Sequence, residues 1–316
     1  MLSNLSLVLT PTEQVLKCGA FAPTHHSNEE PEERRPKPAL IYSGNKCGYR
    51  DVLQQVGPAD WRELSLVDPF VGSAGLLLAA PDCRDYEASD INPDVINVLE
   101  AIRDRPRSLL SELDQLFVPE NNTDERFRSL RTEFNSNQSS FSWSALFVYL
   151  NRHGFNGLVR YNRHGEFNVS FGKRRQPHLP KAEILALSEF LLRRRVTLST
   201  SDFVAKLSAI KRRSVIVLDS PYLGSDGAAP AGIYRVGGFG DDDQQRLVQL
   251  AHELAKDGHY VIAFNYASAA TRQLHHRATE LHELEVRTRI APTAAARGLV
   301  RELVAVYRPR AGRTTV

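Results

Sequence analysis

Short apolar runs alternate with stretches of helical periodicity along most of the chain. LSLVD, SVIVLD and HYVIAFN are compact apolar runs that end in polar residues, which is typical of strands in a parallel sheet. NPDVINVLEAIR and DDDQQRLVQLAHELAKDG repeat apolar residues at helical spacing and predict amphipathic helices. HELEVRTRIA and LVRELVAVY predict two closing strands. This order of elements predicts an α/β fold built on a doubly wound sheet.

The pattern changes in the middle of the chain and predicts an inserted, mostly helical subdomain. Within the insert, Phe141 to Pro177 mixes glycine, asparagine and aromatic residues, so we expect loops and a hairpin there. Near the start, residues 39–56 predict a short strand, a loop and a helix. The expected parts are a flexible leader, a catalytic sheet domain in two pieces, the insert and a tail: residues 1–37, 38–100 with 199–310, 101–198 and 311–316.

Composition is typical of a globular cytoplasmic protein. Charged residues make up 24% of the 316 residues, and no run of about 18 apolar residues predicts a membrane span. The N-terminus lacks the features of a secretory signal. Cys18, Cys47 and Cys83 are far apart and odd in number, which indicates neither a disulfide framework nor a zinc site and favours a reducing compartment. We expect no bound metal and no membrane contact.

Positive charge is concentrated in one segment of the chain. Residues 151–213 hold 14 Lys and Arg against 4 Asp and Glu, although the net charge of the whole chain is only +3. Basic triplets begin at Lys173, Arg193 and Lys211. One triplet would be typical of a solvated helix face, but three with few acids between them favour a polyanionic partner, above all nucleic acid.

A glycine-containing turn and an acid on the next strand predict a nucleoside-binding site. DPFVGSAGL links a strand to a helix, where backbone N–H groups can approach a ligand. About twenty residues later, Asp90 ends the next strand and can accept hydrogen bonds from ribose hydroxyls. The alternative is that Asp90 only stabilises the following helix, which Asn92 and Pro93 are expected to start. The chain lacks G-x-G-x-x-G and the P-loop motif, which disfavours a dinucleotide or a P-loop nucleotide.

The tetrapeptide DSPY predicts a site for a flat ligand with an amino group. It follows SVIVL, so it lies at the carboxyl end of a strand, where open α/β sheets bind ligands. Asp219 and the carbonyl oxygen of Ser220 can accept both hydrogens of an exocyclic amine, and Tyr222 can stack on the ring for about 1–3 kcal/mol. Two such acceptors would localise the lone pair of the nitrogen. The structural alternative is a strand-end turn with a packed tyrosine.

Together these motifs resemble the Dam-type, or D12 class, DNA adenine-N6 methyltransferases, and are similar to the phage-type members. The matching pieces follow the family's order across about residues 39 to 308: IYSGNK, DPFVGSAG, SDINPDVINV, LNRHGFNGLVRYNRHGEFNVSFGKR, STSDF, DSPYL, GFGDDDQQRLVQLA, AFNYAS and RTRIA with RELVAVY. Each piece is weak alone, whereas the combination is specific.

The resemblance implies a fold, a reaction and partners. The fold is the Rossmann-like sheet of S-adenosylmethionine-dependent methyltransferases with an inserted target-recognition subdomain. The reaction transfers a methyl group from S-adenosylmethionine to the N6 amine of an adenine flipped out of double-stranded DNA, in a GATC-like sequence. The oligomeric state, monomer or weak dimer on DNA, and the setting, phage, restriction-linked or solitary, stay open.

The resemblance also assigns roles to residues. The catalytic motif comprises Asp219, Ser220, Pro221 and Tyr222. Cofactor binding is assigned to Tyr42, Gly44, Lys46, Asp68, Phe70, Gly72, Asp90, Asp202 and Phe203. DNA binding is assigned to hairpin residues, of which Arg160 reads a base and the others hold phosphates or shape the hairpin: Arg160, Asn162, Arg163, Ser170, Lys173 and Arg174.

Three positions depart from the family's usual pattern. Ser220 replaces the first proline of D-P-P-Y, Ser170 replaces the proline of PFG in the hairpin, and Ala74 stands where a second glycine is common. Ser220 keeps the backbone carbonyl but loses the rigidity of proline, and Ser170 bears on the sequence recognised. A cytosine-N4 methyltransferase and a DNA-binding relative with weak catalysis are the alternative functions.

Individual candidates also have structural alternatives. Lys46 could be a solvated loop residue, Asp202 a helix cap, and Arg160 a partner of Glu166. The remaining polar residues of the hairpin region could be turn residues or surface histidines rather than ligands: Asn151, Asn156, Asn162, His153 and His164.

Overall fold

The structure is a computed structural model that describes residues 12–16, 36–42, 44–136, 138–222, 238–287 and 299–309. Most of the predicted leader and the whole predicted tail lie outside these residues. Among the described residues, no helix is both long and apolar enough to cross a bilayer.

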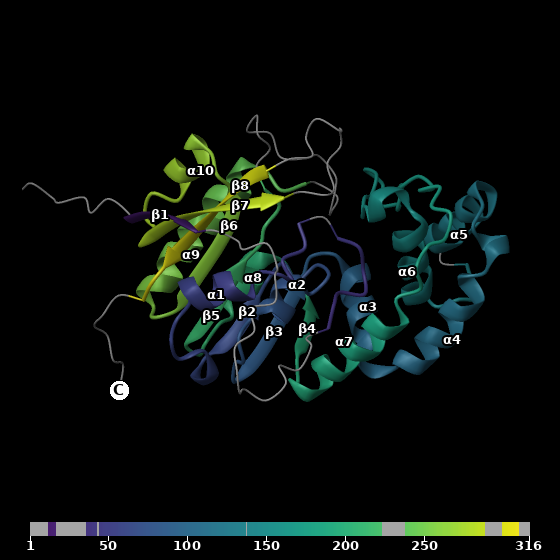
Figure 1. The fold of residues 1–316 in the computed structure, drawn as a ribbon, viewed down its shortest axis with the longest axis horizontal. Helices are drawn as coiled ribbons and strands as arrows, with labels where there is room; N and C mark the ends of the chain where they lie inside the picture. The colour runs from purple at the N-terminus through teal and green to yellow at the C-terminus, as the bar shows by residue number, and fades with distance from the viewer. Residues whose placement is uncertain are drawn as a thin grey trace, which may run out of the picture.

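A single mixed sheet of eight strands organises the described part of the chain (Figure 1). Its spatial order is β1-β7-β8-β6-β5-β2-β3-β4, and every neighbouring pair is parallel except the two pairs that involve β8. The strands are β1 (Thr12–Leu16), β2 (Ser65–Asp68), β3 (Asp85–Asp90), β4 (Thr197–Thr200), β5 (Ser214–Leu218), β6 (Tyr260–Tyr266), β7 (Glu280–Arg287) and β8 (Leu299–Tyr307). The predicted α/β, doubly wound fold is confirmed.

The strand order reverses between β2 and β5. From β2 the chain builds outward through β3 to β4, and it then returns to place β5 on the other side of β2. Such a reversal leaves a crevice at the carboxyl ends of the two central strands, which is where open α/β sheets bind ligands.

Both faces of the central strands are apolar, because each face carries its own layer of helices. Val215 and Val217 of β5 belong to one core cluster, whereas Ile216 and Leu218 belong to another. Helices α1 (Arg50–Val56), α2 (Gly75–Ala79) and α3 (Pro93–Asp104) contribute to the first cluster. Helices α8 (Phe203–Ser208) and α9 (Asp241–Lys256) contribute to the second. This explains why β5 reads as an uninterrupted apolar run rather than an alternating one.

The insert is a helical subdomain beside the β4 edge of the sheet, seen in blue to teal in Figure 1. Asn92 caps α3 by accepting the N–H of Asp94 at 3.0 Å, and Pro93 is the first helical residue, as predicted. The helices and turns that follow α3 and make up the insert are α4 (Pro106–Leu116), η2 (Pro119–Asn121), α5 (Asp124–Ser136), α6 (Trp143–His153), η3 (Phe155–Gly157) and α7 (Lys181–Arg193).

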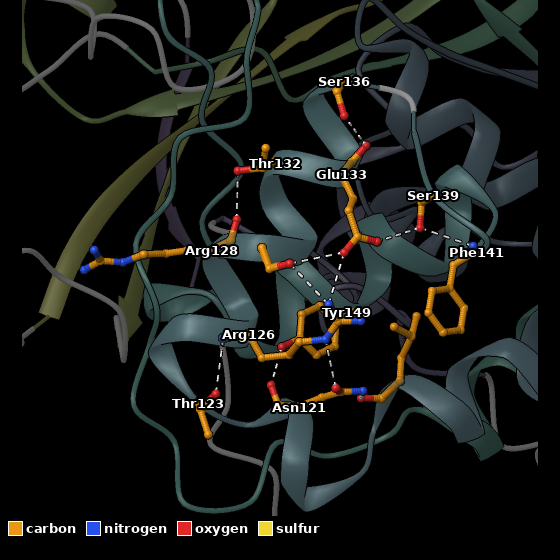
Figure 2. Close-up of polar contacts among 12 residues, drawn as sticks. Asn121, Thr123, Arg126, Arg128, Thr132, Glu133, Ser136, Ser139, Phe141 and Tyr149 are labelled. Atoms are coloured by element: carbon orange, nitrogen blue, oxygen red, sulfur yellow. Dashed lines mark hydrogen bonds and ion pairs between the residues drawn. The ribbon is translucent and has the colours of Figure 1, made fainter.

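A polar network around α5 holds the insert together (Figure 2). The Arg126 guanidinium donates to Asn121 Oδ1 at 3.2 Å and to Glu133 Oε1 at 3.1 Å. Glu133 Oε2 in turn accepts the hydroxyl of Ser139 at 3.0 Å, and the hydroxyl of Tyr149 on α6 donates to Asn121 O at 2.5 Å. The network therefore links α5 to η2, to α6 and to the segment that precedes α6.

The sequence-based prediction of loops from Phe141 onward was wrong for the first part of that stretch. Trp143–His153 is helix α6, which starts with a cap by Ser142 and is buried from Ser144 to His153. Its apolar run packs against α3, α4 and α5. His153 is therefore a buried residue with a ring stacked on Tyr149, and not the expected surface histidine.

The described residues of the segment before α1, 36–42 and 44–49, form no strand, contrary to expectation. Ala39 and Leu40 are buried, but their neighbours bond with α6 instead of the sheet. Asn151 accepts the N–H of Ile41 and donates to its carbonyl oxygen, both at 2.8 Å. Asn151 is thus a fully buried bridge rather than a turn residue. A different strand, β1, falls inside the predicted leader and pairs in parallel with β7.

Candidate active site

Three aspartates lie at the carboxyl ends of three neighbouring strands. Asp68 is the last residue of β2, Asp90 is the last of β3, and Asp219 directly follows β5. Since β5, β2 and β3 are adjacent and parallel, these ends meet at one edge of the sheet. Burial, and then the charges of Asp219 and Asp90, raise the pKa of Asp68 well above its ordinary value. The structure therefore brings all three predicted acids together.

Asp90 ties the glycine-containing turn to the start of α3. Its Oδ2 accepts the N–H of Gly72 at 3.0 Å, and its Oδ1 accepts that of Asn92 at 2.9 Å. Carboxylate oxygens have two lone pairs each, so this arrangement can also accept a ligand's hydroxyl groups. Burial raises the pKa of Asp90 to about 6, although the two N–H groups oppose the shift.

The turn after β2 packs closely against the segment before α1. Gly72 has φ +46°, and a Cβ there would lie 2.9 Å from the ring of Tyr42. At Gly75 a Cβ would lie 2.4 Å from Asn45 Oδ1, so only glycine fits. Ala74 adopts φ 68°, a left-handed conformation that favours glycine. The turn thus keeps the shape of a glycine-rich loop even though alanine stands at one of its positions.

The side chain of Lys46 is buried in contact with the DSPY motif, so Lys46 is not a solvated loop residue. Its side chain is 2% exposed, and its Nζ lies 3.3 Å from Asp219 Oδ1 and 3.6 Å from Glu302 Oε2. Nζ also donates to the carbonyl oxygen of Gly44 at 2.9 Å and lies 4.9 Å from the ring centroid of Tyr222. This ammonium is therefore the positive centre of a buried cluster with two carboxylates.

The charges around Asp219 oppose one another. Burial is the main cause that raises the pKa of Asp219, and the charge of Glu302 adds to it, whereas the Lys46 ammonium lowers it. The side chain of Asp219 is 22% exposed, so it can still reach a ligand. The ionised carboxyl group acts as an acceptor only, whereas the protonated group is also a donor, and Lys46 favours the ionised form.

Tyr222 is held by its hydroxyl and by a second aromatic ring. The hydroxyl donates to Glu302 Oε2 at 3.3 Å. The ring packs edge to face with Tyr266, with centroids 4.9 Å apart and planes at 76°. Burial raises the pKa of Tyr222 well above its ordinary value, so the phenol stays a neutral donor. The ring is fixed beside Asp219, as a stacking platform requires.

The backbone of DSPY is anchored from a neighbouring helix. Ser220 is 3% exposed. The next carbonyl oxygen, that of Pro221, accepts the side-chain amide of Gln244 on α9 at 2.7 Å. Asn265 of β6 donates to Gln244 Oε1 at 3.3 Å and fixes the orientation of that amide. Gln244 and Asn265 therefore restrain a turn that has lost one of its usual prolines.

Three aromatic rings form an apolar wall near the carboxyl ends of β2 and β4. Phe70 stacks on Phe203 with centroids 5.6 Å apart and planes at 29°. Phe239 packs against both rings, at 5.8 Å and 5.6 Å. Asp202 caps α8 by accepting the N–H of Val204 at 2.9 Å, which confirms its helix-cap alternative. Such a wall beside a polar strand end fits a flat, apolar ring.

The predicted hairpin carries the candidate DNA-binding residues. It is closed by isolated antiparallel bridges between Gly154 and Phe171 and between Tyr161 and Phe167. Arg160 donates from Nε to Asn168 Oδ1 at 2.8 Å and from Nη2 to Asn168 O at 3.1 Å. Asn168 is therefore the partner of Arg160, and the alternative pairing with Glu166 is wrong.

The other candidate hairpin residues shape its turn or extend into solvent. Asn162 accepts the N–H groups of His164 and Glu166, and so it organises the tip of the hairpin, as its turn alternative proposed. Ser170 accepts the N–H of Phe155 at 2.8 Å through its carbonyl oxygen. Among the basic side chains, Arg163 and Lys173 are exposed and Arg174 is partly buried.

Tyr161 links the hairpin directly to the start of α3, next to Asp90. Its hydroxyl donates to Asp94 Oδ2 at 2.5 Å and lies 3.1 Å from the side-chain nitrogen of Asn92. Asn92 also donates its backbone N–H to Asp90. Two successive contacts, from Tyr161 to Asn92 and from Asn92 to Asp90, thus connect the hairpin to the acid that ends β3.

Comparison with known proteins identifies the family. The D12 class of N6 adenine-specific DNA methyltransferases matches residues 42–290. The chain belongs to this family. The DNA adenine methylase of Vibrio cholerae is 34% identical over 277 residues, which cover 87% of this chain and 98% of that protein. The DNA adenine methylase of Escherichia coli K12 is 34% identical over 270 residues, 85% of this chain and 95% of that protein.

A solved structure of an rRNA methyltransferase, AviRa from Streptomyces viridochromogenes, is 13% identical and aligns with a TM-score of 0.33. That alignment covers 84% of this chain and 87% of AviRa.

The geometry of the site adds residues that the sequence patterns did not single out. Glu302 completes the charge cluster, Gln244 anchors DSPY, and Phe239 completes the aromatic wall. Phe155, at the base of the hairpin, is 53% exposed, which is unusual for a phenylalanine. Only Phe155 had a signal in the sequence, a large apolar residue between glycine and asparagine in a loop. Among the residues described, no group of three metal-ligating side chains occurs.

The three basic triplets do not form one surface. The triplet at Lys173 lies at the end of the hairpin, whereas those at Arg193 and Lys211 precede β4 and β5, at the opposite edge of the sheet from the aspartates. There, Arg194 pairs with Asp82 at 2.7 Å, and Arg213 pairs with Asp60 at 3.1 Å. Residues 151–213 therefore do not present one continuous basic surface.

This separation predicts different effects on DNA affinity. In Lys173→Ala/Arg174→Ala, the dependence of log K on log salt should become shallower by about 1–2, because each lost phosphate contact removes about 0.9 from the slope. In Arg212→Ala/Arg213→Ala, the slope should stay unchanged, because those residues lie at the other edge. Titration of a fluorescent duplex at several salt concentrations measures both slopes. Equal slopes for the two variants would contradict this assignment.

Proposed function

We propose that the protein transfers the methyl group of S-adenosylmethionine to N6 of an adenine flipped out of double-stranded DNA, within a GATC-like sequence. The observation that carries the proposal is the meeting of Asp90, Asp68 and Asp219 at one sheet edge, with a hairpin anchored beside them. Family membership supports the adenine target, and the site geometry supports the roles below.

The residues at this edge fit S-adenosylmethionine better than a phosphorylated nucleotide. Asp90 can accept the ribose hydroxyls, and the wall of Phe70, Phe203 and Phe239 can hold the adenine ring. The edge is acidic, which favours a cationic sulfonium and disfavours phosphate groups. When bound, the cofactor supplies an electrophilic methyl group.

The protein's part in the reaction is to hold and polarise the target amine. Asp219 and the carbonyl oxygen of Ser220 accept its two hydrogens, which localises the lone pair on nitrogen. Tyr222, fixed by Glu302 and Tyr266, stacks on the base. Asp219 is recessed, so a base inside the duplex cannot reach it, and flipping supplies the access.

The hairpin supports recognition of double-stranded DNA. Arg160 is held by Asn168, which orients the guanidinium for bidentate contact with guanine O6 and N7. The exposed ring of Phe155 lies at the hairpin base and can contact bases, as apolar wedges do in other complexes. Arg163 and Lys173 are exposed and can contact phosphates.

Transfer of tritium from labelled S-adenosylmethionine to duplexes with one candidate base tests the proposal. We expect label in N6-methyladenine after digestion to nucleosides, and none with a duplex that offers only cytosine. Label in N4-methylcytosine would establish the alternative target. DNA binding without transfer would mean that the Ser220 replacement has produced a binding-only relative.

Cofactor affinity is expected to fall as the pH drops through about 6, because the pKa of Asp90 is raised to about 6. The protonated carboxyl group accepts fewer hydrogen bonds, so binding requires the form that dominates above this pH. Calorimetric titration with S-adenosylhomocysteine between pH 5 and 8 measures this. Asp90→Asn should bind weakly, with little dependence on pH in this range. An unchanged wild-type affinity down to pH 5 would exclude Asp90 as the ribose acceptor.

A further inference from the structure

The buried Glu302 has entered the proposed function only as an acceptor for the Tyr222 hydroxyl. It is 7% exposed and lies on β8, 80 residues after Tyr222 along the chain. Strand β8 is antiparallel to β6, so the amino-terminal half of β8 lies at the same edge as the carboxyl ends of β5 and β6. In this register Glu302 lies opposite Tyr266, the ring that packs on Tyr222.

A single oxygen of Glu302 gathers three polar groups from separate parts of the chain. Glu302 Oε2 accepts the hydroxyl of Tyr49 at 2.9 Å and that of Tyr222 at 3.3 Å, and it lies 3.6 Å from Lys46 Nζ. Tyr49 directly precedes α1, Lys46 lies in the loop before it, and Tyr222 follows β5. A buried carboxylate is costly unless it is paired and hydrogen-bonded, and here it is both.

We infer that Glu302 is a positioning residue for methyl transfer, which holds the Tyr222 ring and shares the Lys46 ammonium with Asp219. This inference rests on the proposed function. Loss of the hydrogen bond between Tyr222 and Glu302 would free the Tyr222 ring to leave the stacking position, although Tyr266 would still contact the ring. Removal of the Glu302 charge would leave Lys46 with Asp219 as its remaining carboxylate partner among these groups.

The second effect gives Glu302 a signature that a structural role would lack. The charged or titratable groups facing Glu302 are Lys46, Tyr49, Tyr222 and, across Lys46, Asp219. The charge of Glu302 raises the pKa of Asp219, and Lys46 lowers it. Without that charge, Asp219 stays ionised to lower pH. The acid limb of the rate profile should therefore move to lower pH.

The experiment compares single-turnover methyl transfer by the wild type, Glu302→Gln, Tyr222→Phe and the double variant, across a pH series. For Glu302→Gln we expect a rate lower by about 10–100-fold near neutral pH, as misplacement of a substrate platform can cause, with the acid limb moved to lower pH. Tyr222→Phe should lower the rate but move the acid limb to higher pH, because the Tyr222 hydroxyl lowers the pKa of Asp219. The double variant should be no slower than the slower single variant, because both changes act on one hydrogen bond: glutamine is a weaker, uncharged acceptor, and phenylalanine has no hydroxyl to donate.

Controls separate this inference from the proposed function and from unfolding. Glu285→Gln makes the same chemical change on β7, where the side chain is 48% exposed, and should behave as the wild type. The positioning role would be overturned if the wild type were active, the two substitutions had multiplicative effects in the double variant, and the acid limb did not move. A wild type that methylates no adenine would instead overturn the proposed function.

If Glu302→Gln does not fold, Tyr49→Phe, which removes one contact and no charge, should lower the rate while leaving cofactor affinity unchanged. An unchanged rate in Tyr49→Phe would overturn the inference.

Discussion

Asp219→Asn is expected to lower the rate of methyl transfer by about 10²–10³-fold, the usual cost of losing an electrostatic contact to the reacting group. The amide keeps the size of the side chain but loses the negative charge that polarises the target amine. Lys46 retains Glu302 as a partner at 3.6 Å, so the buried cluster keeps one ion pair and the fold should survive. Single-turnover transfer from labelled cofactor measures the rate.

DNA and cofactor affinities supply the control for this variant. Asp219 does not belong to the hairpin or to the aromatic wall, so both dissociation constants should stay within a few-fold of the wild type. A variant that binds both ligands and still transfers the methyl group near the wild-type rate would show that Asp219 is not the acceptor.

Arg160→Ala is expected to abolish most discrimination at one base pair of the recognised sequence. A bidentate arginine contact with guanine contributes about 1–3 kcal/mol of discrimination, which is roughly 5–150-fold in relative rate. Rates on duplexes that differ at one base pair measure this ratio. The loss should be confined to a single position, since each bidentate contact reads one base.

Arg163→Ala is the matched variant, with an exposed arginine at the hairpin tip that can contact only phosphate in our account. It should weaken binding to all duplexes about equally and leave the preference intact. If Arg160→Ala behaved in the same way, Arg160 would be a phosphate contact, and another residue would read the base.

The sequence predicted those parts of the site that follow from strand ends. Asp219 follows the apolar run of β5, Asp90 ends the short strand β3, and the carboxyl ends of adjacent parallel strands meet at one edge. Their convergence therefore depends only on the strand order. Asn92 and Pro93 likewise predicted the start of α3 through local chemistry alone.

The remaining parts depend on contacts between segments far apart along the chain. Glu302 reaches the site because β8 runs antiparallel beside β6, and the sequence pattern of a strand does not reveal its direction or its neighbours. Gln244 was part of an amphipathic helix pattern, in which nothing marked it as the anchor of Pro221. Lys46 was assigned to the cofactor site, with a solvated loop lysine as the alternative, and nothing in the sequence marked its buried partners Asp219 and Glu302.

Local composition misled in two places. The stretch before the hairpin contains polar and aromatic residues that suggested loops, yet burial among α3, α4 and α5 makes Trp143–His153 a helix. The basic triplets follow one another in the sequence, but the one at Lys173 belongs to the hairpin, whereas those at Arg193 and Lys211 precede β4 and β5 at the amino ends of these strands. In the first case, tertiary packing overrides the local preference for loops. In the second, the fold separates basic segments that are close in the sequence.

The most direct test of the central claim is a crystal structure of the protein with S-adenosylhomocysteine and a duplex that contains the target adenine. The account predicts that this adenine lies outside the stack on Tyr222, with N6 at hydrogen-bond distance, about 2.6–3.2 Å, from Asp219 and from the carbonyl oxygen of Ser220, and with the cofactor ribose at Asp90. A complex in which the adenine of a bound target sequence contacts neither Asp219 nor Tyr222, or in which the cofactor lies away from Asp90, would contradict it.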